Sequence, residues 1–211
     1  MKRCLLLLLF GVFSISSLAS AVVSVQIGCK RLLLVLPPGL SPSKVNREWA
    51  SGIFRSEAPA VLELRGCKGQ LLDQITLEAP LARLEPAPLR GTPVPTYLVS
   101  VDLTQAAGSY NGPLTFPVQV VNSHLERVVA LADDGRMEPI HLPITGKAAW
   151  KKISIKGVDN FFSVSCQPQD KHFVIIYRRY NPTREGWRVH TRSSPGFWES
   201  DGEFPELEQF P

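Results

Sequence analysis

The chain has 211 residues, with 23 Lys and Arg against 19 Asp and Glu, and 44% of its residues are hydrophobic. Once Lys2 and Arg3 of the leader are set aside, the remaining charges nearly balance, so net charge alone does not indicate a nucleic-acid or membrane partner. The part that follows the leader has about 190 residues, which suits one large domain or two small ones.

The first 21 residues have the three parts of a secretory signal peptide. Lys2 and Arg3 form a positive start, residues 4–13 form an apolar run, and Ala19-Ser20-Ala21 places small residues at positions −3 and −1. A retained membrane anchor is the alternative, but the apolar run is shorter than the ~20 residues that a span needs. We therefore expect cleavage after Ala21, no transmembrane span in the mature chain, and a secreted or periplasmic (cell-envelope) location.

A lipidated cysteine is a further alternative reading of the start of the chain. Gly28-Cys29 imitates a lipidation site, but it lies far from the apolar run, and Gln26 stands at its −3 position, where a leucine-like residue is expected. We therefore favour an unlipidated mature chain.

Three cysteines remain after cleavage, and an exported chain meets an oxidising compartment in which disulfides persist. Cys29 and Cys67 each stand in a Gly-Cys-Lys sequence at the end of a strand-like run, so we predict that these two pair. Cys166 is in phase with Phe162 and Val164, and we interpret it as a buried thiol that packs as a small hydrophobe.

Alternation of apolar and polar residues dominates the mature chain. Such runs begin at Val23, Tyr97, Leu114, Ile140, Phe162 and Trp187. A period of two, with turn residues between the runs, is typical of strands that place one face on a core. The runs 32–36 and 173–177 are apolar on both faces, so we expect them inside their sheets. The pattern predicts an all-β fold, an immunoglobulin-like or related β-sandwich, arranged as one domain or as two small ones.

The segment that ends in Gly108-Ser109-Tyr110, followed by the strand-like run 114–121, resembles the Gly-x-Tyr corner of secreted immunoglobulin-like domains. In that family the Tyr hydroxyl bonds back to the backbone and locks a turn. Ala106 takes the place of the usual Asp four positions before the Tyr. The resemblance implies a sandwich and implies nothing about function.

One short helix is predicted over about residues 42–54. Ser41 is a suitable N-cap, Pro42 fits the first helical position, and Val45, Trp49 and Ile53 recur at a spacing of four. We expect this helix to cover an edge or an open end of the sandwich.

Three prolines interrupt strand-like runs, at positions 117, 139 and 143. Because proline has no N–H to donate to a ladder, the strands that contain Pro117, Pro139 and Pro143 should be edge strands or carry bulges.

Composition changes near Thr145-Gly146-Lys147. Residues 147–192 hold ten basic and three acidic side chains, whereas residues 193–211 hold five acidic side chains and no basic one. We predict a β-sandwich domain over 22–146, a basic, aromatic-rich β segment over 147–192, which is a second half-domain or a small domain, and an acidic C-terminal tail over 193–211.

The basic segment supplies the candidate binding residues. They stand on or beside three strand-like runs, which we expect to align them as one positive sheet face: Lys151, Lys152, Lys156, Arg178, Arg179, Arg188 and Arg192. Such a face would hold phosphates or carboxylates with its cations, while nearby aromatic rings stack on bases or sugars. The alternative is an ordinary solvated face, and the tail either docks on this face, stays disordered or binds a partner.

No catalytic or metal-binding motif emerges. Ser41-x-x-Lys44 has the spacing found in acyl-transfer enzymes that attack peptidoglycan or β-lactams, but their companion Ser-Asp-Asn and Lys-Thr-Gly elements are absent. The four histidines are scattered without metal-ligand spacing, and Asp133-Asp134-Gly135 lacks the spacing of a calcium loop. We interpret this last sequence as the turn of a hairpin between residues 128–131 and 138–144. We expect no cofactor and no metal.

Three hypotheses of function follow from the sequence. The first is a non-enzymatic secreted or cell-envelope module with a binding or structural role, whose partner is an envelope protein or a glycan. The second is a module that binds a polyanion, a nucleic acid or an anionic glycan, through the basic residues named above; nucleic acid is not favoured. The third is a hydrolase that acts on envelope polymers.

Overall fold

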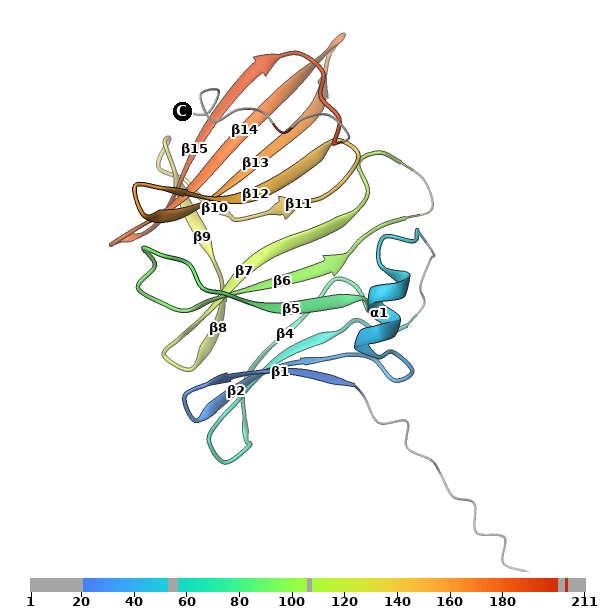
Figure 1. Cartoon of the computed structure of the whole chain (residues 1–211), viewed down its shortest axis with the longest axis vertical. Helices are drawn as coiled ribbons and strands as arrows, with labels where there is room; N and C mark the ends of the chain where they lie inside the picture. Colours follow the sequence, from blue (N-terminus) through green and yellow to red (C-terminus); the bar gives the residue numbers. More distant parts are fainter. Residues whose placement is uncertain (1–20, 53–56, 106–107, 201–203, 205–211) are drawn as a thin grey trace, which may run out of the picture.

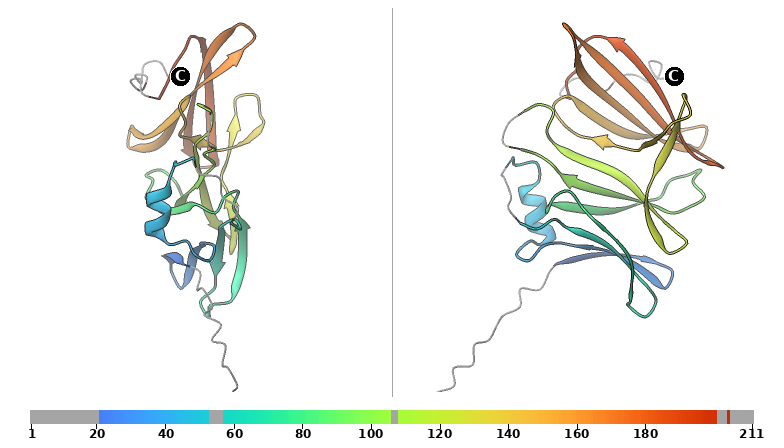
Figure 2. Two further views of the ribbon diagram at one scale, coloured as in Figure 1. Left: turned by 90° about the vertical axis from the view of Figure 1, so that its right-hand side faces the viewer. Right: turned by 180° about the vertical axis from the view of Figure 1, so that it is seen from behind.

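The computed structural model of the protein describes residues 21–52, 57–105, 108–200 and 204. These residues form fifteen strands and one helix, which confirms the predicted all-β class. The strands make three sheets that follow one another along the long axis of the molecule (Figures 1 and 2). Within the described ranges, no helix has the length and apolar character needed to cross a membrane. The predicted leader falls almost wholly outside these ranges and stays a prediction.

Sheet A is an antiparallel meander at the N-terminal end of the molecule. It consists of β1 (Val22–Ile27), β2 (Lys30–Val35), β3 (Val61–Arg65) and β4 (Leu71–Thr76), in that order. The apolar run of β2 lies inside the sheet, as predicted. Immunoglobulin domains use Greek-key connections. Because sheet A is a meander, the structure fits the second part of the prediction, a β-sandwich related to the immunoglobulin fold.

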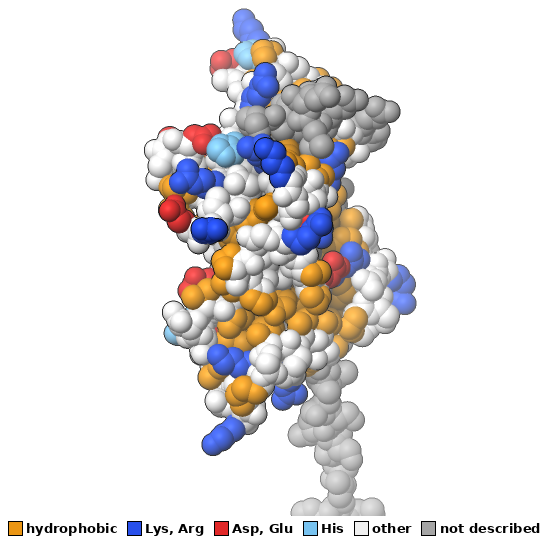
Figure 3. All heavy atoms as spheres, turned by 60° about the vertical axis from the view of Figure 1, so that its left-hand side comes forward, with side chains coloured by type: hydrophobic (Ala, Val, Ile, Leu, Met, Phe, Trp, Pro, Cys, Tyr) orange, Lys and Arg blue, Asp and Glu red, His pale blue; other side chains and the backbone are white. Residues whose placement is uncertain are grey.

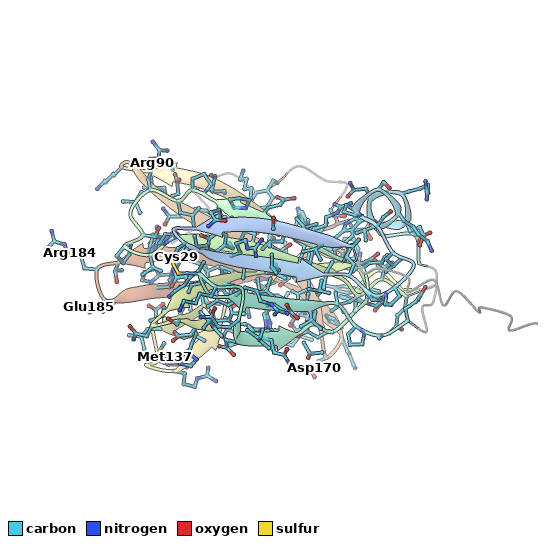
Figure 4. All side chains as sticks on the ribbon, turned by 90° about the horizontal axis from the view of Figure 1, so that it is seen from below. Cys29, Arg90, Met137, Asp170, Arg184 and Glu185 are labelled. Carbon is cyan, nitrogen blue, oxygen red and sulfur yellow. A yellow bond between two sulfur atoms is a disulfide. The ribbon has the colours of Figure 1, made fainter. Side chains whose placement is uncertain are left out.

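The predicted disulfide between Cys29 and Cys67 is confirmed. Cys29 stands in the turn between β1 and β2, and Cys67 stands in the turn between β3 and β4. Figure 4 shows the bond in yellow beside the Cys29 label. The bond joins two neighbouring hairpin ends of sheet A, while Cys166 is a buried free thiol, as expected.

Sheet B packs on sheet A and makes the sandwich. It consists of β5 (Ala82–Ala87), β6 (Thr96–Asp102), β7 (Pro113–Val121) and β11 (Leu142–Pro143), in the order β11-β7-β6-β5, and β8 (His124–Arg127) pairs with β7. Its alternate residues Val99, Val101 and Phe116 share one fully buried core with Leu34 and Leu62 of sheet A. The alternation of apolar and polar residues in the sequence therefore corresponds to an apolar face on each of the two sheets.

The helix begins where predicted but ends earlier. α1 (Pro42–Glu48) starts at the Ser41 cap, whose hydroxyl accepts the N–H of Lys44, but it stops before Trp49. The next residue, Ala50, has a φ of 54° and donates its N–H to Asp102 Oδ2 at 2.8 Å. The carboxylate of Asp102, at the end of β6, thus accepts a backbone N–H that would otherwise bond within a longer helix. Residues 53–56, including Ile53, lie outside the described residues.

Sheet C is the largest sheet and forms the opposite end of the molecule. It consists of β9 (Val129–Ala132), β10 (Met137–Pro139), β12 (Ala148–Ile155), β13 (Val158–Gln169), β14 (His172–Thr183) and β15 (Gly186–Pro195), in the order β10-β9-β15-β14-β13-β12. Its pairs are antiparallel except for β9 with β15. The apolar run of β14 lies inside the sheet, as expected. Since β9 and β10 precede Gly146, sheet C draws strands from both sides of the predicted composition boundary.

An aromatic cluster joins sheet C to sheet B. Phe161 of β13 is stacked on Trp187 of β15, with ring centroids 5.3 Å apart, and meets the edge of Trp150 of β12 at 5.8 Å. Leu98 of β6 and Leu142 of β11 complete this core from sheet B. The face of sheet C that carries Phe161 is called the inner face below, and the opposite face, which carries Phe162, is called the outer face.

The prolines stand where a missing N–H is tolerated, although one of them is not in an edge strand. Pro139 lies in β10 and Pro143 in β11, each at the edge of its sheet, as predicted. Pro117 lies in β7, which has neighbours on both sides and pairs with β6 without a register shift, so the expectation of an edge strand or a bulge is wrong there. Pro117 falls between the stretch of β7 that pairs with β11 and the stretch that pairs with β8, and its carbonyl accepts the N–H of Val128 at 2.9 Å.

A buried carboxylate fastens the β5–β6 loop to sheet C. Asp159 is 5% exposed and accepts the backbone N–H of Arg90 at 3.1 Å and its guanidinium at 3.1 Å. The backbone hydrogen bond from Arg90, together with the hydrogen bond and charge of the guanidinium, lowers the pKa of Asp159 below 3.8. Its contribution to stability is therefore present above that pH and is lost as the pH falls through the lowered pKa.

Asp159→Asn is expected to lower the free energy of unfolding by about 2 kcal/mol at pH 7, because it removes a charged acceptor of these bonds. The difference from the wild type should shrink as the pH falls through the lowered pKa of Asp159, where the wild-type carboxyl is also neutral. Urea unfolding at pH 7 and at pH 3 measures both values. The matched control is Asp170→Asn, at an exposed position in the turn between β13 and β14, which should change stability little. A difference that is the same at both pH values would contradict the role of the charge.

Candidate functional site

The candidate site lies where the chain crosses the inner face of sheet C. β10 and β12 are the two edges of that sheet, so the connecting segment 140–147 must cross between them. The predicted hairpin partner 138–144 is therefore shorter than expected, since β10 ends at Pro139 and Leu142–Pro143 pairs with β7 instead. The crossing segment and the sheet line an open pocket of about 500 Å³.

This inner pocket combines polar side chains from several elements. It is lined by Tyr110, Arg136, Glu138, Pro139, His141, Pro143, Thr145, Lys147, Ala148, Ser163, Ser165, Cys166, Gln167, Arg178 and Tyr180. Its volume falls within the ~300–1,000 Å³ of small-molecule sites. The arrangement can therefore hold a small polar ligand.

The inner face has an apolar half and a polar half. The apolar half, which includes Phe161 and Val189, packs on sheet B. Farther along β13, Ser163 pairs with Arg178 of β14, and Ser165 follows on the same face. Residues that are paired across strands share one face of a sheet, so these three polar side chains project together toward the crossing segment. The alternation of side chains along β13 and β14 therefore places the two serines and Arg178 on the same face.

Ser165 has a hydroxyl that is buried and unpartnered. The residue is 8% exposed, and its Oγ makes no hydrogen bond to any residue that the structure describes. A buried hydroxyl without a partner costs about 1–3 kcal/mol. The residue lines a pocket but its oxygen is screened from solvent, so a polar group of a bound ligand reaches this hydroxyl, and removes that cost, after a rotation of the serine side chain.

Arg178 is half-buried in the same wall. None of the ion pairs between the described residues involves it. The other basic side chains of the lining are engaged: Arg136 binds Asp134 at 2.6 Å, and Lys147 pairs with Glu199. Arg178 therefore offers a guanidinium whose donors face the pocket without an anionic partner.

Two further groups of the pocket are neutral at pH 7. Desolvation by the atoms around it, followed by the positive charges of Arg127 and Arg178, lowers the pKa of the exposed His141 below 6.5. Burial raises the pKa of Tyr180 to about 12, so its phenol stays protonated and can donate a hydrogen bond. The fixed positive charge that faces the pocket without a partner thus comes from Arg178.

The residues predicted to form one positive face are divided between two faces. The register places Lys151, Arg179, Arg188 and Arg192 on the outer face, and Lys152 and Arg178 on the inner face. Lys156 stands in the turn between β12 and β13 with a φ of 50°. The expectation of a single basic face is therefore wrong, and Arg178 belongs to the inner pocket. On the side shown in Figure 3, Lys and Arg side chains are interspersed with His and acidic side chains over sheet C.

The described part of the tail docks on the outer face. Trp198 and Phe204 pack against a buried cluster that includes Phe162 of β13. The Lys151 ammonium lies 4.2 Å from the centroid of the Phe204 ring, and Lys147 pairs with Glu199. Of the three alternatives for the tail, docking holds for the part that carries Trp198 and Phe204, whereas its first residues, 193–195, are the end of strand β15. Its acidic residues Asp201, Glu203, Glu206 and Glu208 lie outside the described residues.

The sequence pattern did not single out the two pocket serines. Ser163 and Ser165 alternate with Phe162, Val164 and Cys166, a pattern that predicts a strand with one apolar face. The available signal was the length of the β13 run and its aromatic start at Phe161, which together indicate a strand buried on both faces. Tyr110, which resembled a tyrosine corner, instead lines the inner pocket and is 51% exposed.

Comparison with known proteins adds no assignment: no family model, no curated protein and no solved structure matches the chain. Among the described residues, no three His, Cys, Asp or Glu side chains come together to hold a metal ion. The inner pocket is thus the candidate site that the geometry supports.

Proposed function

We propose that the chain is a non-enzymatic, exported module of the cell envelope or the extracellular space, and that it binds a ligand in the inner pocket. One observation carries this proposal. The buried, unpartnered hydroxyl of Ser165 and the unpaired guanidinium of Arg178 belong to the lining of the same pocket. Unsatisfied polar groups that converge in a pocket are typical of a binding site.

Two features support export. The first 21 residues have the order of a cleavable leader, and the mature chain contains the Cys29–Cys67 disulfide. Disulfides persist in oxidising compartments and are rare in the cytosol. Together with the absence of a membrane-spanning helix from the described residues, these features fit a periplasmic or extracellular protein.

The pocket favours binding over hydrolysis. A serine nucleophile needs a base within hydrogen-bond reach, but the Ser165 hydroxyl has no partner among the described residues, and His141 does not reach it. The geometry also favours the pocket over an extended polyanion surface. The basic residues stand on two faces, and aromatic residues of the tail cover part of the outer face.

The test is binding of the mature chain, residues 22–211, to an array of saccharides and peptides. We expect a subset of the array to bind, and Ser165→Phe, which fills the pocket, should weaken this binding at least tenfold. Ser154→Phe makes the same change at an exposed position of β12 and should leave binding unchanged. Arg178→Gln provides a second pocket variant if Ser165→Phe does not fold.

Different results would overturn the proposal. If Arg188→Glu with Arg192→Glu abolished binding while both pocket variants kept it, the outer face would be the site, as the polyanion hypothesis predicts. Release of cleaved saccharide from the array would indicate a hydrolase. Mass spectrometry of the product from cells that express the full chain should show Val22 as the first residue, and an intact leader on a cytosolic product would contradict export.

A further inference from the structure

The charge of the inner pocket points to the class of ligand. Arg136 of the lining already holds Asp134 and lies 3.9 Å from Glu138, and the Lys147 ammonium is held by Glu199. Among the described cations that line the pocket, Arg178 alone has no ion pair. One unpaired guanidinium matches one monovalent oxyanion, and its planar fork of donors fits the two oxygens of a carboxylate.

The rest of the lining suits a ligand with several hydroxyl groups. Ser163 and Ser165 present hydroxyls beside Arg178, and Gln167 adds an amide that can donate and accept. Because each of these groups can donate or accept, they match the alcohols of a sugar better than a purely apolar molecule. The unpartnered Ser165 hydroxyl requires such a partner most strongly.

Aromatic side chains complete the pocket. Tyr110 lines the pocket and is 51% exposed, while the protonated Tyr180 contributes a hydroxyl donor. A tyrosine offers an apolar face together with a polar tip, a combination that suits a sugar ring with polar edges. The cavity of about 500 Å³ has room for a ligand of one or two sugar rings.

We infer that the inner pocket binds an acidic saccharide, with the carboxylate of a uronic acid on Arg178 and the sugar hydroxyls on Ser163 and Ser165. This inference rests on the proposed function and adds the chemical class of the ligand. Phosphorylated sugars are disfavoured because a dianionic phosphate would meet a single unpaired cation.

The experiment compares three sugars that share one ring. Glucuronate carries a carboxylate where glucose carries a hydroxymethyl group, and glucose 6-phosphate carries a phosphate at that position. Each is titrated into the ¹⁵N-labelled mature chain, and amide resonances are followed by NMR. We expect glucuronate to shift the resonances of Ser163, Ser165 and Arg178 and to bind at least tenfold more tightly than either other sugar.

Variants assign the carboxylate to its partner. Arg178→Gln should weaken glucuronate binding at least tenfold and bring it to the level of glucose, while Arg192→Gln, on the outer face, should leave it unchanged. Ser165→Ala should weaken both sugars by about threefold, since it removes one hydrogen bond of ~0.5–1.5 kcal/mol. Ser165→Ala also serves as the pocket variant if the spectrum of Arg178→Gln shows loss of the fold.

The outcomes separate this inference from the proposed function. Equal binding of glucose and glucuronate, insensitive to Arg178→Gln, would overturn the carboxylate assignment and leave a binding pocket. Tighter binding of glucose 6-phosphate would assign a phosphate instead. If the pocket bound array ligands but none of the three sugars, the saccharide class would be wrong. Absence of binding by any sugar or array ligand would overturn both proposals.

Discussion

Replacing Phe161 with alanine is expected to lower the free energy of unfolding by about 4 kcal/mol. The side chain is fully buried, and its ring contacts Trp187 at 5.3 Å and Trp150 at 5.8 Å between centroids. These contacts belong to the core that holds sheet C on sheet B. Loss of the ring leaves a cavity between two aromatic walls that the rigid strands do not close.

Urea unfolding, followed by tryptophan fluorescence and by far-ultraviolet circular dichroism, measures this loss. The matched control is Phe173→Ala, since Phe173 is 37% exposed and lies on the same sheet; its cost should stay below about 1.5 kcal/mol. Similar losses for the two variants would contradict the role given to Phe161. Separate transitions for the two signals would indicate that the sheets unfold as independent domains.

Removal of the Cys29–Cys67 disulfide should cost about 4 kcal/mol. The bond closes a loop with a sequence separation of 38 residues, and the loss follows from the entropy that this loop restores to the unfolded chain. The double variant Cys29→Ser with Cys67→Ser is compared with the wild type by urea unfolding. Each single variant should lose about as much as the double variant.

Reductant provides the matched control for the disulfide. Dithiothreitol should lower the stability of the wild type to that of the double variant and should leave the double variant unchanged, because Cys166 is a free thiol. An equal effect of reductant on both proteins would show that the stabilisation does not come from this bond.

The strands and the disulfide were predictable because they depend on local patterns. A strand in a sandwich must hide alternate side chains, so the period of two appears in the sequence around Val99 and Phe116. Tight turns at Gly28-Cys29 and after Arg65 placed both cysteines at strand ends. The start of the helix was equally local, since Ser41 and Pro42 are adjacent to the residues that they cap.

The position at which the helix ends, and the sheet face on which each basic residue lies, could be known only from the tertiary structure. Asp102, more than fifty positions along the chain from Ala50, accepts the N–H that follows the helix. The alternation within one strand already separates neighbours such as Arg178 and Arg179, but it does not show how neighbouring strands pair. The pairing of Phe161 with Tyr180 puts Lys152 and Arg179 on opposite faces.

The amino-acid sequence by itself determined the all-β class, the cysteine pair and the start of the single described helix, because alternation, turn residues and caps act over a few positions. The tertiary structure decided which face of sheet C each cation occupies and where a cavity forms. The inner pocket exists because segment 140–147 crosses from one edge strand to the other above Ser163, Ser165 and Arg178. Such a crossing depends on strand order, which joins residues distant in the chain and leaves no periodic signal in it.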